Sequence, residues 1–197
     1  FFGVRYNRGP CRSGRTDLTP GVIAEAVDTS LARLQIDYID LYQIHWPQRN
    51  VPMFGATEFD PSKEKGGPSI GEQVEGMAAM IKAGKIRFIG ASNFEAPRLA
   101  EAAKISEQKG LPRYESLQPH YNLMERGLFE GALEDQCLKQ GIGVIPYYSL
   151  ASGFLTGKYR SEADVGSAQR GAGVKKYINP KGMAVLKALD DAAKAGD

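Results

Sequence analysis

The sequence predicts a parallel α/β fold. Four short segments rich in β-branched and aromatic residues, at 37–45, 85–91, 115–118 and 143–147, are separated by single helical patterns. Strands joined by one helix form βαβ units, which require parallel strands and right-handed crossovers. Two closures satisfy this pattern, an open doubly wound sheet and a (β/α)8 barrel. Four strands match half a barrel, because complete barrels typically need about 250 residues.

The composition indicates a folded protein with small partners. Hydrophobic residues make up 42% of the 197 residues and the formal net charge is +2, which favours neither disorder nor binding to nucleic acid or a membrane surface. No apolar run approaches the roughly 18 residues of a membrane helix. Cys11 and Cys137 are far apart, and no asparagine lies in an Asn-x-Ser/Thr acceptor. We therefore expect a cytoplasmic protein with reduced thiols.

The first helix and the first strand precede a long loop. Thr19-Pro20 provides an N-cap and a first-turn proline, and apolar residues then recur at helical spacing to Leu34. The first strand ends at His45, because the Trp-Pro that follows cannot continue a β-ladder. Residues 48–68 contain three prolines, three glycines and no periodic pattern, which predicts a loop.

The middle of the chain contains two helices with clear end signals. The capping box Ser69-x-x-Glu72 begins one helix, and Gly84 ends it. The strand that follows alternates in polarity, as a half-buried strand does. Ser92-Asn93 then supplies an N-cap for a helix that continues to about Lys109.

The last third of the chain has one more βα pattern and a C-terminal helix. A helix is predicted near 128–140, closed by Gly141, and a glycine-rich turn at 153–158. Residues 160–176 are polar and glycine-rich, which predicts an irregular flap. Asn179-Pro180 caps a final helix with an apolar stripe.

Polar and aromatic residues follow the end of every predicted strand. They are His45, Ser92-Asn93, Gln118 and Tyr147-Tyr148-Ser149. Sites in parallel α/β folds are built at the carboxyl ends of the strands. Each of them also has a plain structural interpretation. His45 could be a core histidine and Ser92-Asn93 a helix cap. Gln118 could be a turn residue before proline, and Tyr147 a packed ring. Their shared position favours a functional site.

Three other chemistries fit this sequence poorly. The segment Gly153–Lys158 is one residue too short for the phosphate loop GxxxxGK[ST], and Tyr159 stands at the Ser/Thr position, although exposed amides near its lysine suit a pyrophosphate. His45 and His120 lack a ligand cluster, so no metal site is predicted. Cys137 lies on the apolar face of a helix, which favours packing over nucleophilic catalysis.

Four blocks of the sequence resemble the aldo-keto reductase family. They are Asp37–Pro47, Gly84–Phe94, Leu117–Asn122 and Pro146–Tyr159. The resemblance covers almost the whole chain, and it looks closest to the bacterial NADPH-dependent branch and to relatives of the potassium-channel β-subunits. It implies a (β/α)8 TIM barrel, of which residues 1–197 would form a partial domain with strands four to seven.

The resemblance also implies a role for each matching residue. His45 matches the tetrad histidine that orients and polarises the substrate carbonyl, and Trp46 would line the substrate pocket. The residues that match the cofactor-binding positions are Ser92, Asn93 and Gln118 for the carboxamide, Tyr147 for stacking on the nicotinamide, and Leu150, Gly153, Leu155, Gly157 and Lys158 for the pyrophosphate. The implied cofactor is NADPH, and the implied substrate is a small aldehyde or ketone that is reduced to an alcohol.

The sequence departs from the family pattern in two respects. Tyr148-Ser149 stands where the family usually has Ser-Pro. The Asp, Tyr and Lys of the tetrad are expected before Phe1, and the eighth strand after Asp197. Without the tyrosine acid, we expect the 197 residues alone to reduce no carbonyl, and unpaired strand edges to promote homo-oligomers. The alternative is a non-catalytic cofactor-binding regulatory protein that resembles the channel β-subunits.

Overall fold

The computed structural model describes residues 17–47, 66–166 and 171–196. They form two compact units, which are considered separately. The first contains the described residues up to Gln118 together with Ala132–Ile145, and the second contains Pro119–Gly131 and the described residues from Pro146 onward. Cys11 and the greater part of the predicted loop lie outside the described residues. No helix in the described ranges is long and apolar enough to cross a membrane.

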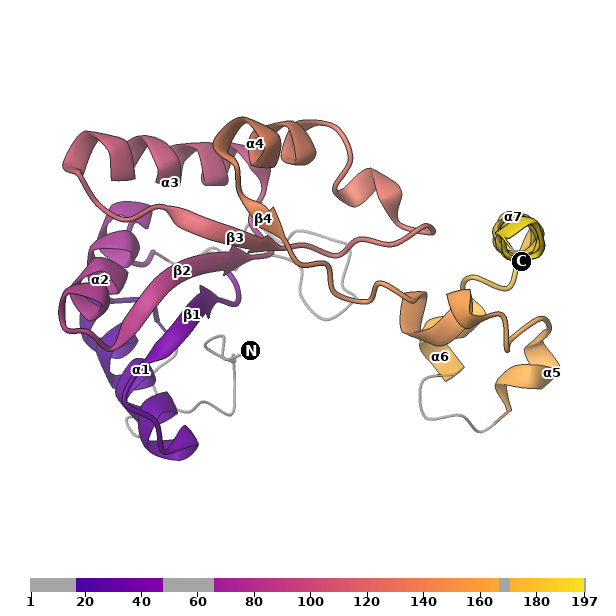
Figure 1. Cartoon of the computed structure of the whole chain (residues 1–197), viewed down its shortest axis with the longest axis horizontal. Helices are drawn as coiled ribbons and strands as arrows, with labels where there is room; N and C mark the ends of the chain where they lie inside the picture. The colour runs from indigo at the N-terminus through magenta and orange to yellow at the C-terminus, as the bar shows by residue number, and fades with distance from the viewer. Residues whose placement is uncertain (1–16, 48–65, 167–170, 197) are drawn as a thin grey trace. The chain divides into compact units, whose positions relative to one another are not determined.

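A parallel sheet forms the centre of the first unit (Figure 1). Its strands, in spatial order, are β1 (Ile39–Ile44), β2 (Ile86–Ser92), β3 (Tyr114–Gln118) and β4 (Gly143–Val144). The helices beside them are α1 (Pro20–Leu34), α2 (Ile70–Lys82), α3 (Ala96–Lys109) and α4 (Ala132–Gln140). All neighbouring strands are parallel, and the helices lie along one face of the sheet. The predicted parallel α/β fold is therefore confirmed, in an arrangement that matches part of a (β/α)8 barrel.

The core of this unit lies between the sheet and its helices. Ile44, Ile89 and Leu117 come from three adjacent strands, and each side chain is at most 2% exposed. The predicted apolar stripes of α1 and α2 are buried as well, for example at Val27 and Met77. Full burial of one such side chain contributes about 1.5–3 kcal/mol, so the matching apolar faces hold the helices on the sheet.

Most of the predicted helix ends are present. Ser69 Oγ accepts a hydrogen bond from Glu72 N at 3.2 Å, and the Glu72 carboxylate accepts one from Ser69 N at 2.8 Å, so the capping box is complete. Gly84 adopts a φ of 71° just after α2, a conformation that glycine reaches without strain. Thr19 precedes α1 in an extended conformation but makes no side-chain cap, and its hydroxyl donates to Asp17 at 2.6 Å.

Two predictions about helix starts are wrong. Ser92-Asn93 does not cap α3, which begins at Ala96 with Glu95 at the N-cap position. The predicted helix at 128–140 is also shorter, because Gly131 has a φ of 93° and separates a 3-10 turn, η2 (Arg126–Leu128), from α4. The apolar spacing continued across this glycine, and the sequence pattern therefore extended the helix too far.

The strands also differ in detail from their predictions. The predicted strand at 143–147 is interrupted, because Pro146 has no N–H to donate, and pairing resumes only at Tyr147 in a parallel bridge to His120. In β2 the burial does not alternate as predicted. Arg87 and Phe88 are both exposed, whereas the four residues from Ile89 to Ser92 are all buried. Ile86, the first residue of β2, is buried as well, so the exposed part of the strand is confined to Arg87 and Phe88.

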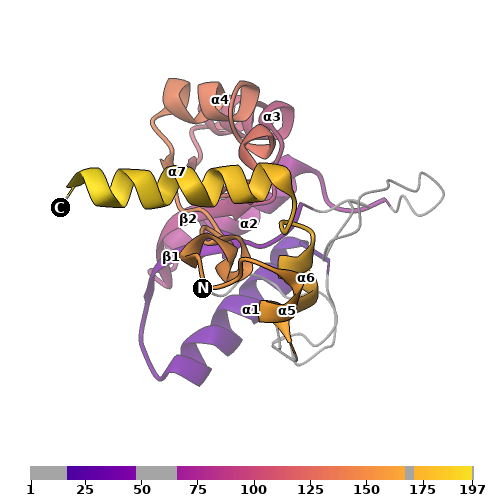
Figure 2. The same cartoon turned by 90° about the vertical axis from the view of Figure 1, so that its right-hand side faces the viewer.

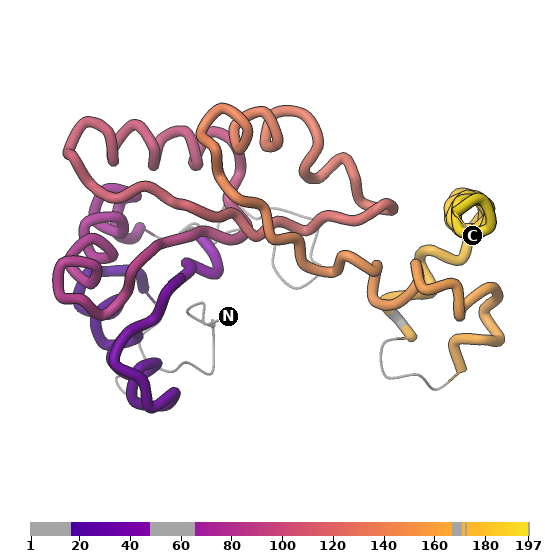
Figure 3. Tube along the Cα trace, viewed as in Figure 1, coloured from indigo at the N-terminus to yellow at the C-terminus, as the bar shows by residue number. Residues whose placement is uncertain are grey.

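Short helical segments and one long C-terminal helix make up the second unit after Pro146 (Figure 2). Its elements after Pro146 are η3 (Ala151–Thr156), α5 (Glu162–Val165), α6 (Gly171–Lys175) and α7 (Pro180–Gly196). Figure 3 traces their backbone. The buried apolar cluster of this unit comprises Met124, Ala151, Phe154, Tyr159, Val165, Val174, Tyr177 and Leu186.

The start of α7 and the segment before it show one correct and one wrong prediction. The side-chain oxygen of Asn179 accepts a hydrogen bond from Gly182 N at 3.0 Å, which confirms the predicted cap of α7. The irregular flap predicted at 160–176 is wrong in its described parts. They contain α5 and α6, because Val165 and Val174 enter the apolar cluster and hold these short helices against it.

Candidate functional site

The carboxyl ends of β1, β2 and β3 are joined by hydrogen bonds from Ser92 and Asn93. Ser92 Oγ donates to the main-chain oxygen of Gln118 at 2.7 Å, and Asn93 Nδ2 donates to the main-chain oxygen of His45 at 2.8 Å. Asn93 Nδ2 also donates to Ser92 Oγ at 3.1 Å. Asn93 has a φ of 60°, a left-handed conformation that asparagine tolerates better than most residues. The structure therefore brings together four of the residues predicted from the sequence.

His45 lies at the end of β1 beside Trp46. Their ring centroids are 5.5 Å apart with planes inclined by 45°, and both side chains are half-buried. The contact from Asn93 is made to the main-chain oxygen of His45, so it fixes the backbone at the end of β1. An imidazole at the end of a strand can polarise or protonate a bound group.

A polar layer that the sequence analysis missed lies beneath these residues. Gln43 Nε2 donates to Ser116 Oγ at 2.9 Å, and both side chains are buried. Gly90 lies between them in the sheet register, and a Cβ atom at this position would be only 2.2 Å from Ser116 Oγ. These three residues stand two positions before His45, Ser92 and Gln118. The period of two in a strand could have identified them as the next layer on the same face.

In the second unit, Tyr147 is held by main-chain hydrogen bonds. Tyr147 N donates to Pro119 O at 2.9 Å, and the ring is half-buried. Burial, reinforced by the neighbouring Tyr148, raises the pKa of the Tyr147 phenol above its ordinary value. The phenol is therefore uncharged at neutral pH, and it presents a flat apolar ring rather than an activated acid.

The predicted pyrophosphate segment forms a tight turn in the same unit. Ser152 and Gly153 are consecutive left-handed residues, with φ values of 60° and 99°. The turn is closed by its own main-chain hydrogen bonds, because Gly153 N donates to Leu150 O at 2.8 Å and Leu155 N donates to the same oxygen at 3.2 Å. Phe154 is fully buried and anchors the turn, whereas Lys158 is exposed with its ammonium 4.9 Å from the centre of the Tyr159 ring. Lys158 is therefore the group of this segment that could attract a phosphate by its charge.

The other residues of the segment contribute its shape. Gly157 has a φ of 77°, which ends the turn and accommodates a conformation that favours glycine. Leu150 is exposed and Leu155 is partly buried. Within residues 17–47, 66–166 and 171–196, no three His, Cys, Asp or Glu side chains converge as metal ligands would. Cys137 is buried as predicted, and burial raises its pKa, so the thiol is poorly suited to act as a nucleophile.

Comparison with known proteins identifies extensive similarity. A model of the Aldo/keto reductase family matches residues 9–197. Protein tas of Escherichia coli (strain K12) is 35% identical over 167 residues, which are 82% of this chain and 48% of that protein. An aldo-keto reductase of Babesia bovis is 34% identical over 190 residues, or 91% of this chain and 67% of that protein.

A further relative bears on the cofactor. The NADH-specific methylglyoxal reductase of Escherichia coli (strain K12) is 34% identical over 167 residues, which cover 85% of this chain and 45% of that protein. The chain thus spans about half the length of Protein tas and of the methylglyoxal reductase.

Proposed function

Because this chain belongs to the aldo/keto reductase family, we propose that it forms part of an oxidoreductase that reduces aldehydes or ketones with NADPH. Residues 1–197 would then be part of one (β/α)8 barrel domain. The observation that carries the proposal is the hydrogen-bonded edge of His45, Asn93, Ser92 and Gln118. These residues supply an imidazole and amide and hydroxyl groups at the carboxyl end of the sheet, and barrel enzymes bind their substrates at that end.

We propose that His45 binds the substrate carbonyl. Its imidazole would donate a hydrogen bond to the carbonyl oxygen as negative charge develops there. Trp46 would form an apolar wall of the substrate pocket beside it. NADPH supplies a hydride when it is bound. The described side chains at the strand ends would hold the substrate and the carboxamide of the cofactor in fixed positions, which is how an enzyme lowers the entropic part of the barrier.

The hydrogen bonds of Ser92 define how it would contact the cofactor. Its hydroxyl proton is donated to Gln118 O, and one oxygen lone pair accepts from Asn93 Nδ2. One lone pair therefore remains to accept an N–H of the carboxamide. Asn93 and Gln118 would supply the remaining amide contacts, so that this group fixes which face of the nicotinamide meets the substrate.

The second unit would supply the other cofactor contacts. Tyr147 offers an uncharged ring for stacking on the nicotinamide. The ammonium of Lys158 would bind the pyrophosphate through its charge, and the left-handed turn at Ser152-Gly153 would lie beside that group. Leu150 and Leu155 would pack beside the pyrophosphate. Gly157, with its left-handed φ, would allow the chain to turn away from that group.

Tyr147→Ala should weaken NADPH binding by about 1–3 kcal/mol, a magnitude taken by analogy from bases stacked on aromatic side chains. The ring is the part of Tyr147 that would contact the nicotinamide, so Tyr147→Phe serves as the matched control and should bind almost as tightly as the wild type. Both affinities can be measured by fluorescence titration with NADPH. Equal affinity in a correctly folded alanine variant would remove Tyr147 from the cofactor site.

A further inference from the structure

The ring of His120 stacks on the ring of Tyr147. Their centroids are 5.2 Å apart and their planes are inclined by only 15°. Tyr148 packs edge-on against both, with centroid distances of 5.6 Å to His120 and 5.4 Å to Tyr147. The family resemblance gave no role to His120, yet its ring covers the tyrosine that we assign to the nicotinamide.

Asn122 contacts the imidazole of His120, and its other hydrogen bonds fix which of its side-chain atoms faces the ring. Its side-chain oxygen accepts from the main-chain N–H groups of Met124 and Glu125, at 2.8 and 3.1 Å. The orientation of the amide is thereby settled, and Nδ2 must face the opposite way. It donates to Tyr148 O at 3.0 Å and lies 3.4 Å from His120 Nε2.

An amide N–H directed at His120 Nε2 requires this nitrogen to be an acceptor. The imidazole is then neutral, with its proton on Nδ1. Protonation of Nε2 would set two donors against each other and break the contact with Asn122. Since Asn122 is only 5% exposed, the side chain has little freedom to turn and offer its oxygen instead.

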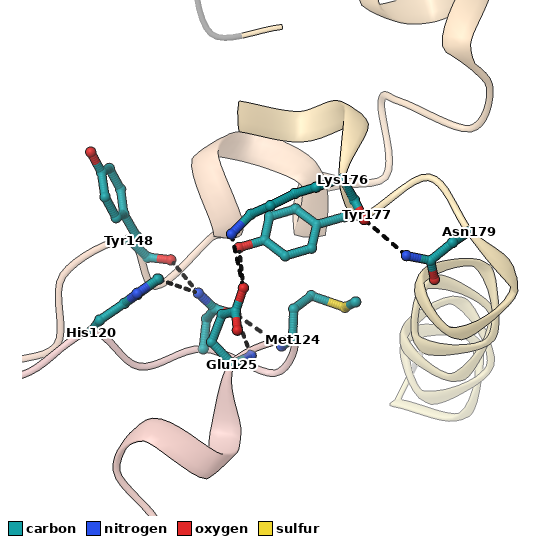
Figure 4. Close-up of polar contacts among 8 residues, drawn as sticks. His120, Met124, Glu125, Tyr148, Lys176, Tyr177 and Asn179 are labelled. Carbon is teal, nitrogen blue, oxygen red and sulfur yellow. Dashed lines mark hydrogen bonds and ion pairs between the residues drawn. The ribbon is translucent and has the colours of Figure 1, made fainter. Parts of the chain in front are cut away.

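Two charged groups near His120 act on it in opposite directions. Glu125 favours a positive imidazole, whereas Lys176 opposes it. The Glu125 carboxylate is engaged by Lys176 Nζ at 3.0 Å and by the Tyr177 hydroxyl at 2.9 Å, as Figure 4 shows. Burial is the largest influence, and it lowers the pKa of His120 below its ordinary value.

We propose that His120 is a positioning residue for the cofactor: its neutral ring, held by Asn122, supports Tyr147, and protonation of His120 weakens binding of the nicotinamide. This inference rests on the proposed function. It gives a direction to the pH dependence. The supporting contact is present above the pKa of His120 and is lost as the pH falls through it, below the ordinary value of about 6.5. The oxidised nicotinamide is cationic, so protonation should weaken binding of NADP⁺ more than binding of NADPH.

The test asks whether cofactor affinity depends on protonation of the His120 imidazole, in the full protein that contains this chain. Dissociation constants for NADP⁺ and NADPH are measured from pH 8 to pH 5 in the wild type and in His120→Phe, which keeps a ring but cannot titrate. The cofactor phosphate also titrates, with a pKa of about 6, but this effect is common to both proteins and cancels in their ratio. We expect the wild type to lose about five- to tenfold in NADP⁺ affinity relative to the variant, and less for NADPH.

A second readout does not depend on cofactor binding. In the same full protein, the signals that disappear in His120→Phe are those of His120 in a long-range ¹H–¹⁵N spectrum. We expect the Nδ1–H tautomer and a midpoint below that of free histidine. His120→Gln, which keeps an acceptor for Asn122 but lacks the ring, should bind the cofactor more weakly and without the pH dependence that is specific to His120.

The possible results separate this inference from the proposed function. If the cofactor binds and His120→Phe retains the pH dependence of the wild type, or if the spectrum shows the Nε2–H tautomer, the role of His120 is overturned while the proposed function stands. If the wild type binds neither NADPH nor NADP⁺ at any pH, the proposed function fails and the role of His120 fails with it.

Discussion

Replacing His45 by alanine should lower kcat/KM for a test aldehyde by about 10²- to 10⁴-fold, the range for a positioned acid–base or polar group. In the proposed function, the imidazole would interact with the carbonyl oxygen as charge develops there. The variant should still fold, because Asn93 donates to the main-chain oxygen of residue 45, which alanine retains. Steady-state kinetics on the complete reading frame that contains this chain provide the measurement.

The matched control for His45→Ala is Leu138→Ala on α4. Leu138 is 74% exposed, so its truncation should change neither the fold nor the kinetics. A thermal unfolding curve for each protein separates a catalytic loss from a loss of structure. If His45→Ala retains the kcat/KM of the wild type, the imidazole is a structural group at the strand end and the assignment of the carbonyl to it is wrong.

Gly182→Ala should destabilise the second unit by about 2–4 kcal/mol, because the added methyl has no space. A Cβ atom at this position would lie 1.9 Å from the main-chain oxygen of Tyr177 and 2.9 Å from the buried ring of Phe154. The first of these atoms belongs to the backbone, so the start of α7 would have to move away from the apolar cluster. Urea unfolding followed by circular dichroism measures the loss.

Gly21→Ala provides a control with the same chemical change in another helix. Gly21 also lies in the first turn of a helix that begins with proline, and no atom stands within 4 Å of the position that its Cβ would occupy. The substitution should be neutral or stabilise α1 by up to about 1 kcal/mol, since alanine favours helices over glycine. Equal effects of the two substitutions would contradict the packing described for α7.

Much of the fold could be predicted because its signals are local. Alternation between strand and helix patterns gave the parallel sheet, and the capping box at Ser69 placed the start of α2 within one residue. Ser92-Asn93 shows where such signals become ambiguous. Short polar side chains after a strand can cap a helix or bond to neighbouring strands, and the sequence pattern is the same in both cases. The three-dimensional arrangement of the strands decides between them.

Other errors came from contacts that are distant in the sequence. The segment 160–176 has the composition of a loop, but the two valines that it places in the apolar cluster stabilise short helices there. The layer formed by Gln43, Gly90 and Ser116 depends on the register between three strands, which no single segment reveals. In contrast, the strand-end residues of the candidate site were recognisable, because parallel strands place their carboxyl ends at one edge.

The most direct measurement of the central claim is aldehyde-dependent oxidation of NADPH by the complete reading frame that contains residues 1–197, with NADH assayed in parallel. The proposed function predicts oxidation only when an aldehyde or ketone is present, with NADPH preferred, and one alcohol formed for each NADPH consumed. A protein that binds NADPH tightly but does not oxidise it with any of a range of aldehydes and ketones would contradict the account. That result would instead identify a cofactor-binding regulatory protein.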